Sequence, residues 1–340
     1  MSKLTLKSNI EDALLSYLEY CEIERDLSQN TIKMYDFYLR DFIGWAKSYK
    51  KRDTISLEEI DDELVKKYRI DLNRRISSKS NLEFKKSTQK TFLIAIRAFL
   101  KFLVVVNELD LLAPEKIILG KGSESVPKVL NEDQLSRMFE VQDLNKISGI
   151  RDHAILEVLF STGLRVSELV NLNVGDINLN SKEFTVLGKG RKVRTVYLSD
   201  SAVTWLKRYL GTRDDPYVPL FLRYSGKHME PGDFDGESLR LTQRSVQRLV
   251  KKYTKRAGVS VDATPHTLRH TFATGLLREG ADLRSVQELL GHSNVATTQI
   301  YTHVTNMQLK DVHKRFHKKA EIKETKKEAI SELGENEPLY

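Results

Sequence analysis

The stretch TPHTLRHTFATGLLREGADLRSVQELLGHSNVATTQIYTHV, residues 264–304, carries the densest set of reactive side chains in the chain. A helix is expected to begin at Thr264, because threonine is a preferred N-cap and the proline after it suits the first helical position. Residues three and four apart are neighbours on a helix. His266, Arg269 and His270 are therefore predicted to share one helix face.

The same stretch continues into further short helices, because Gly280 and Gly291 are typical helix stops. His292 follows the second glycine directly, and Tyr301 follows His292 by nine residues. The pattern indicates a run of short helices that can bring two imidazoles, a guanidinium and a phenol to one place.

A zinc site is a rival interpretation of the paired histidines, since His266 and His270 are four residues apart. However, Arg269 lies between them and would repel a cation, and neither an acidic residue nor a cysteine follows at ligand spacing. We therefore predict that no metal is bound.

The composition is that of a globular protein long enough for two domains, with 340 residues, 40% of them hydrophobic and 30% charged. A single cysteine, Cys21, excludes an internal disulfide and suits a reducing compartment. The N-terminus lacks the apolar region of a signal peptide. The longest apolar run, residues 92–106, contains Arg97 and Lys101, so it is expected to form a buried helix and not a membrane span. We therefore expect a cytoplasmic location.

The positive charge is concentrated in the second part of the chain. Residues 1–120 hold 21 Lys and Arg against 19 Asp and Glu, whereas residues 121–318 hold 30 against 22. A basic domain indicates a polyanionic partner such as nucleic acid, although a basic protein without such a partner fits equally well.

Apolar residues at helical spacing and typical helix starts predict a small helical bundle over residues 1–112. Ser28 and Ser87 are typical N-caps, and the S-x-x-E pairs that begin at Ser8 and Ser56 fit the capping box. Residues 113–130, which include a Gly- and Ser-rich run, predict a linker. The second domain is predicted over residues 131–318, and a charged, disordered tail over 319–340. The cations of the bundle that could contact DNA phosphates are Lys33, Arg40, Lys47, Lys50, Lys51 and Arg52. For any single one of them, a solvated helix face is the simpler interpretation.

The segment TGLRVSEL, residues 162–169, places a second arginine beside an acid. Gly163 can form a turn, Arg165 then opens a helix, and Glu168 lies one helical turn further on, where it can hold the guanidinium. On this segment alone, an ordinary surface salt bridge is the simpler interpretation.

A β-hairpin is predicted from two β-rich runs, residues 184–187 and 193–198, joined by the glycine-containing turn GKGRK. Lys189 lies at its tip, where an ammonium can be delivered to a phosphate or can simply be solvated. A P-loop is excluded because neither Ser nor Thr follows the lysine and no helix opens there.

Taken in order, these motifs resemble the tyrosine recombinases, or phage-integrase-type enzymes, and most closely the Xer-type site-specific recombinases. The resemblance spans about residues 8–318 and is carried by TGLRVSEL, by LGKGRKVRTVYLS (187–199) and above all by residues 265–304. It implies a mainly α fold with a small antiparallel β-hairpin. An N-terminal four-helix, SAM-like core-binding domain would precede a mixed α/β catalytic domain.

The resemblance also implies roles for individual residues. Tyr301 would be the nucleophile that forms an O-(3′-phospho-DNA)-tyrosine intermediate, and Lys189 the general acid. Glu168 and His270 match supporting positions. The remaining catalytic positions are Arg165, His266, Arg269 and His292.

These residue types also suit phosphoryl transfer on physical grounds. Two arginines can donate bidentate hydrogen bonds to phosphate oxygens. A phosphotyrosine bond conserves the energy of the cleaved phosphodiester, so neither ATP, metal nor another cofactor is expected.

The resemblance implies double-stranded DNA recombination sites as partners, with a dimer on each site and a homotetramer that resolves a Holliday junction. A second recombinase or a DNA translocase is a possible further partner. Residues 305–320 are predicted to form a basic helix that docks either on a neighbouring subunit or on its own domain. Two alternatives stay open: DNA relaxation of the type IB topoisomerase kind, and DNA binding without catalysis.

Overall fold

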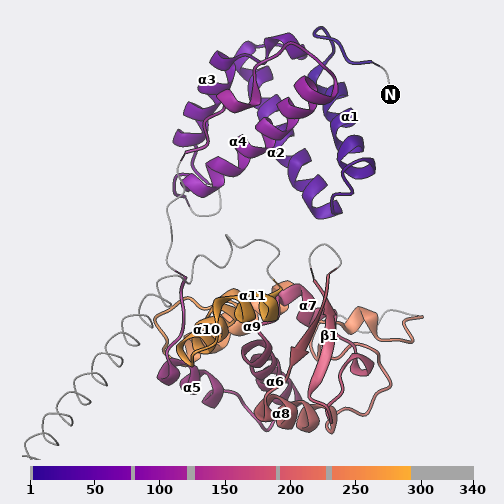
Figure 1. Cartoon of the computed structure of the whole chain (residues 1–340), viewed down its shortest axis with the longest axis vertical. Helices are drawn as coiled ribbons and strands as arrows, with labels where there is room; N and C mark the ends of the chain where they lie inside the picture. Colours follow the sequence, from indigo (N-terminus) through magenta and orange to yellow (C-terminus); the bar gives the residue numbers. More distant parts are fainter. Residues whose placement is uncertain (1–2, 78–80, 121–126, 189–191, 227–231, 292–340) are drawn as a thin grey trace, which may run out of the picture. The chain divides into compact units, whose positions relative to one another are not determined.

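The computed structural model describes residues 3–77, 81–120, 127–188, 192–226 and 232–291 (Figure 1). The chain divides into two compact units, residues 1–124 and 125–340, and each has its own hydrophobic core. Helices dominate both units, and the described strands form one antiparallel pair. The predicted fold class is confirmed. Within the described ranges, no helix combines the length and apolarity needed to cross a bilayer.

The first unit is a bundle around an aromatic core in which Tyr17, Phe42, Tyr68 and Phe99 are buried. Its main helices are α1 (Ile10–Ile23), α2 (Gln29–Lys50), α3 (Asp62–Arg74) and α4 (Lys86–Lys101). Helix α4 continues as the π-helix η2 (Phe102–Val106), and two 3₁₀ turns, η1 (Leu57–Glu59) and η3 (Pro114–Lys116), complete the unit.

Helix starts in this unit follow the predicted chemistry only in part. Ser28 caps α2 as predicted. The cap predicted at Ser87 is wrong, because α4 begins at Lys86 and Ser87 lies within its first turn. The box at Ser8 is wrong, because the neighbouring Asn9 caps α1 instead. The pair Ser56 and Glu59 does form a capping box, but it begins the 3₁₀ turn η1 and not a long helix.

The segment that connects the two units is held at both of its described ends. Its first residues pack on the first unit, and its last residues pack on the second. Ile117 is buried in the first core, and Arg69 Nη1 donates to the carbonyl of Ile118 over 3.1 Å. In the second unit Leu130 is buried, and its backbone N–H donates to Thr271 Oγ1 over 2.9 Å.

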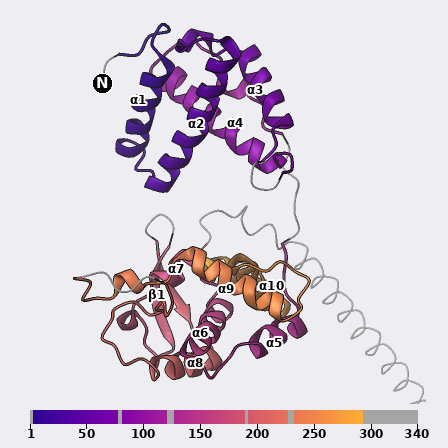
Figure 2. The same cartoon turned by 180° about the vertical axis from the view of Figure 1, so that it is seen from behind.

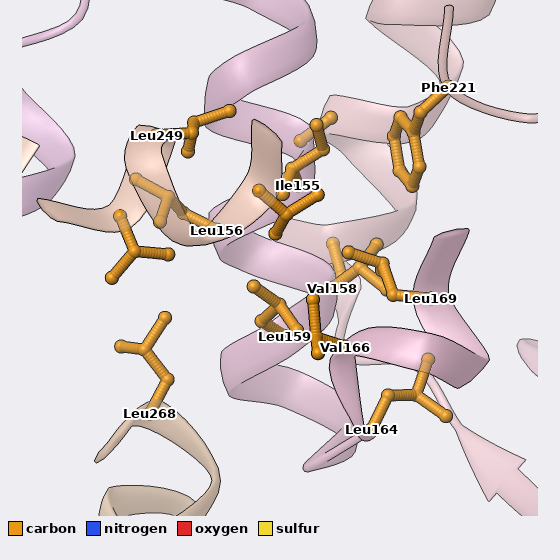
Figure 3. Close-up of a cluster of buried hydrophobic side chains, with 14 of the residues drawn as sticks. Ile155, Leu156, Val158, Leu159, Leu164, Val166, Leu169, Phe221, Leu249 and Leu268 are labelled. Atoms are coloured by element: carbon orange, nitrogen blue, oxygen red, sulfur yellow. The ribbon is translucent and has the colours of Figure 1, made fainter. Parts of the chain in front are cut away.

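The second unit is built around α6 (Ile147–Thr162), which is buried on nearly all sides (Figure 3). Helices α8 (Asp200–Leu210) and α10 (Pro265–Arg278) pack against it. Figure 2 shows α9 (Gln243–Arg256) beside α10. The other elements are α5 (Glu132–Glu140), α7 (Val166–Val170), α11 (Leu283–Leu290), η4 (Val174–Asp176) and η5 (Glu237–Leu239).

The predicted hairpin is present as β1 (Glu183–Leu187) and β2 (Val193–Tyr197). In its register Phe184 faces Val196 and Val186 faces Arg194. Because side chains alternate between the faces of a strand, Arg194 lies on the same face as the buried Val196. Strand β2 packs on both α6 and α11, so this face points into the unit.

Candidate active site

Helix α10 presents three of the predicted residues from its first two turns. Thr264 caps it, with its Oγ1 accepting from the backbone N–H of Thr267 over 3.2 Å, and a proline occupies the first turn. The predicted helix start is confirmed. Arg269 is buried, with 4% of its surface exposed, His270 is half-buried, and His266 reaches the surface.

The turn from α6 into α7 presents Arg165 and Glu168. Gly163 ends α6 with a φ of +60°, and a Cβ there would lie 2.5 Å from Cδ1 of Phe272, so the turn requires glycine. Arg165 then occupies the N-cap of α7, and Glu168 accepts from both its backbone N–H (2.8 Å) and its Nη1 (2.9 Å).

The C-terminal end of α11 brings the arginines together. A helix leaves its last carbonyls without partners and carries partial negative charge at this end. Here three consecutive carbonyls each accept from a different guanidinium. The pairs are Leu289 with Arg194 Nε (3.1 Å), Leu290 with Arg269 Nη2 (2.6 Å) and Gly291 with Arg165 Nη2 (2.9 Å).

Arg269 also fastens the α6–α7 turn, because its Nη1 donates to the carbonyl of Gly163 over 2.7 Å. The same side chain therefore contacts the turn that presents Arg165 and the end of α11. Two arginines predicted from separate motifs converge on one place. A guanidinium presents its N–H donors in a fixed planar fork, a geometry that matches the oxygens of a phosphate or a carboxylate.

The histidines are held in the neutral form. Partial desolvation lowers the pKa of His266, and the charges of Arg269 and Arg165 lower it further. Burial, with His266 and Arg269 nearby, lowers the pKa of His270 to about 4. A neutral imidazole has one N–H donor and one nitrogen acceptor, so each ring can donate and accept a hydrogen bond at this site.

Glu168 is ionised despite its burial. Burial acts to raise its pKa, but hydrogen bonds from Arg194 and Arg165 outweigh that effect and lower it to about 2. The carboxylate is 5% exposed and joins two guanidinium groups. The interpretation of Arg165 and Glu168 as an ordinary surface salt bridge is therefore wrong.

Arg194 is the site residue that the sequence reasoning missed. Its Nη1 and Nη2 donate to the two oxygens of Glu168 over 2.9 and 2.7 Å. The sequence does carry a signal for it. Side chains alternate between the two faces of a strand, so Arg194 is expected on the same face as the apolar Val196.

Lys189, His292 and Tyr301 lie outside the described residues, and their roles stay predictions. The described residues next to them are Gly188 in the hairpin and Gly291 at the end of α11. Within the described ranges, no group of three or more His, Cys, Asp and Glu side chains is arranged to hold a metal ion.

The first unit has a cationic groove that the sequence reasoning also missed. It has a volume of about 780 Å³ and lies between α3 and α4. Its cations are Lys66, Arg69, Arg74, Lys86 and Lys90. One of them, Lys66, pairs with Asp62. Of the six cations named from the sequence as able to contact phosphates, four pair with carboxylates. These pairs are Arg40–Asp36, Lys47–Glu11, Lys50–Glu59 and Arg52–Glu59.

Comparison with known proteins decides the family. The model of the phage integrase family matches residues 128–308, more than half of the chain, and that of the phage integrase N-terminal SAM-like domain matches residues 14–106. The chain belongs to the phage integrase family. As a member it is a tyrosine-type site-specific recombinase with relatives of the Xer type.

This recombinase is 35% identical to tyrosine recombinase XerD of Listeria monocytogenes over 321 residues, which span 92% of this chain and 100% of that one. It is 38% identical to tyrosine recombinase XerC of Pelobacter propionicus over 307 residues, covering 90% and 95% of the two chains. The fold is similar to that of XerH site-specific recombinase, solved with a palindromic difH substrate after cleavage. That likeness has a TM-score of 0.64 at 24% identity and covers 88% of this chain and 83% of XerH.

Proposed function

We propose that this recombinase cuts and rejoins double-stranded DNA at a specific site through a covalent 3′-phosphotyrosine. The observation that carries the proposal is the convergence of Arg165 and Arg269 on the end of α11, one residue before His292. Two guanidinium groups fixed in this way are preorganised for the non-bridging oxygens of a scissile phosphate, where charge develops in the transition state.

The remaining roles follow from the chemistry of the step. Tyr301 attacks phosphorus, its phenolic proton leaves, and the bond from phosphorus to the 5′ oxygen breaks. A phenol with a pKa of about 10 is a weak nucleophile at neutral pH, so it needs the positive field of the arginines and a neighbouring base. The histidines that can act as this base are His266 and His292. Lys189 protonates the leaving 5′ oxygen.

Strand exchange follows when a 5′-hydroxyl of a second DNA attacks the phosphotyrosine. Bond energy is conserved in this exchange, and the arginines neutralise the phosphate, so the reaction requires neither ATP nor a metal. The two strand exchanges pass through a Holliday junction in a tetramer, with a dimer on each site. XerH site-specific recombinase is described bound to a palindromic difH substrate, which supports a recombination site as the ligand here. A DNA substrate places the enzyme on the nucleoid, in the cytoplasm.

The groove between α3 and α4 supports a second DNA contact from the first unit. Its cations can neutralise backbone phosphates, which contribute affinity without reading sequence. The apolar residues Ile70 and Ile94 also line it, so contact with bases or sugars is available next to the phosphates.

The test uses a DNA site selected from random sequence with the full chain, built as a nicked suicide substrate that traps the covalent complex. Wild type should form an adduct resistant to denaturation, and Tyr301→Phe should form none while binding the same DNA. An adduct with Tyr301→Phe would show that another residue is the nucleophile.

Two outcomes separate the alternatives. Exchange between two sites identifies recombination, whereas relaxation of supercoiled DNA without exchange favours the topoisomerase alternative. Specific binding with no adduct from wild type would instead favour a DNA-binding protein without catalysis.

A further inference from the structure

Arg194 lies where three parts of the site meet. Its side chain is 9% exposed and enters the second unit from β2. The fork of its guanidinium grips both oxygens of Glu168, and its Nε donates to Leu289 of α11 over 3.1 Å. One residue thus connects the hairpin, helix α7 and the end of α11.

The shared carboxylate determines the charge at Arg165. Glu168 accepts four hydrogen bonds, two from Arg165 and two from Arg194. With two guanidinium groups on one carboxylate, the cluster keeps a net charge of +1. If Arg165 were its sole partner, Glu168 would neutralise it and weaken its attraction for a phosphate.

Arg194 also lies close to two glycines, each of which directly precedes a predicted catalytic residue outside the described part of the chain. A Cβ on Gly291, the residue before His292, would lie 2.9 Å from Cδ of Arg194. A Cβ on Gly188, the residue before Lys189, would lie 3.5 Å from its Nη1. The guanidinium and its stem therefore pass close to the backbone at both places.

We propose that Arg194 is a positioning residue for strand cleavage. It holds Glu168 so that Arg165 stays oriented and positively charged, and it fixes the residues from which the segments carrying Lys189 and His292 to Tyr301 depart. This inference rests on the proposed function, since it assigns Arg194 a part in that same reaction.

The test compares Arg194→Ala with Arg213→Ala in the full chain. Arg213 is an equally buried arginine of the second unit, 4% exposed, and it pairs with Asp215. Its guanidinium donates to the carbonyls of Pro219 and Tyr217, away from the candidate site. Both variants lose a buried ionic network, so we expect similar losses of folding stability. They differ in that only Arg194 lies at the candidate site.

Three quantities are measured for each variant: the melting temperature, the Kd for the selected DNA, and the single-turnover rate of adduct formation at saturating protein. Arg194→Ala should cleave about 10²-fold more slowly, because small misplacement of reacting groups costs that much. Its Kd should stay within about threefold, since Arg194 acts through other residues and the lost interaction belongs to the transition state. Arg213→Ala should lower the melting temperature and leave the rate of the folded enzyme unchanged.

One further variant and a pH profile separate the effect of position from that of charge. Arg194→Lys keeps the charge but cannot form the bidentate fork, so it should recover only part of the rate. In Arg194→Ala the pKa of Glu168 should rise, and cleavage should become sensitive to acid at a higher pH than in wild type. A variant that is structurally weakened but correctly positioned would show no such shift. If Arg194→Ala does not fold, Arg194→Lys and Arg194→Gln provide the same rate and pH comparisons.

The inference is overturned if Arg194→Ala cleaves at the wild-type rate, or if Arg213→Ala loses as much rate as Arg194→Ala. It is also overturned if the slower cleavage is explained by a matching rise in Kd. The absence of an adduct from wild type would be a failure of the proposed function itself, and the wild-type arm of each experiment identifies that case.

Discussion

The glycine between α6 and α7 provides a quantitative test of how the fold presents Arg165. Gly163 has a φ of +60°, and a Cβ there would lie 2.5 Å from Cδ1 of Phe272. Left-handed backbone costs a residue with a Cβ roughly 1–2 kcal/mol. Overpacking costs about 1–3 kcal/mol more. Gly163→Ala should therefore lower the free energy of unfolding of the second unit by about 2–5 kcal/mol.

Gly258→Ala is the matched control. Gly258 has nearly the same φ, +61°, and among the described residues nothing beyond its chain neighbours lies within 4 Å of the place that a Cβ would occupy. Its substitution carries only the backbone cost of roughly 1–2 kcal/mol. A Cβ on Gly163 would also lie 3.0 Å from Cδ2 of Leu290, so the difference between the two variants measures the contacts with Phe272 and Leu290.

Urea unfolding followed by tryptophan fluorescence isolates the second unit. The chain has two tryptophans, Trp45 in the first unit and Trp205 in the second, so a Trp45→Phe background leaves only the second to report. Equal losses of stability for Gly163→Ala and Gly258→Ala would refute the reasoning, because they would show that Phe272 and Leu290 move aside at no cost. Gly163→Ala should also slow cleavage, since the Gly163 carbonyl accepts from Arg269.

Two further predictions concern pH and salt. The pKa of His270 is about 4 in the folded chain against an ordinary 6.5, so the unfolded chain binds the proton first as pH falls. This contribution to the free energy of unfolding is complete above pH 6.5 and is lost as the pH falls toward 4. In His270→Gln, the free energy of unfolding measured in urea should therefore depend less on pH over this range. An unchanged slope would contradict the assignment. Lys90→Ala should reduce the dependence of log Kd on log salt by about 1, because one phosphate contact is lost. Arg40→Ala, whose guanidinium pairs with Asp36, should change it less, and the reverse order would place DNA against α2 instead.

Local chemistry made much of the fold predictable. The cap and proline at Thr264 act on backbone within one turn, so the start of α10 could be predicted without knowledge of its neighbours. The hairpin followed from glycines and alternation in the same way. The start of α1 is different. Asn9 and Ser8 are both able caps, and the choice depends on a backbone bridge between Asn9 and Ser56, 47 positions further along the chain.

The cations of α2 show why charge could be counted from sequence but not assigned to a surface. Lys47 pairs with Glu11 of α1, and both Lys50 and Arg52 pair with Glu59. These partners are set by the packing of the bundle. The groove between α3 and α4 collects its cations from two helices that meet only after folding. A helix face rich in Lys and Arg thus need not be the face that meets DNA.

The pair Arg165 and Glu168 shows the same limit at the candidate site. Read locally, it resembles an exposed salt bridge, and such pairs contribute about 0–1 kcal/mol. Burial changes its meaning, because removing one partner of a buried ion pair costs about 3–5 kcal/mol. A network built from one carboxylate, three guanidinium groups and the negative end of α11 remains cationic overall while every protein acceptor in it is satisfied. That combination of fixed geometry and residual positive charge is what a site for a phosphodiester requires, and it arises only where segments separated by more than 100 residues meet.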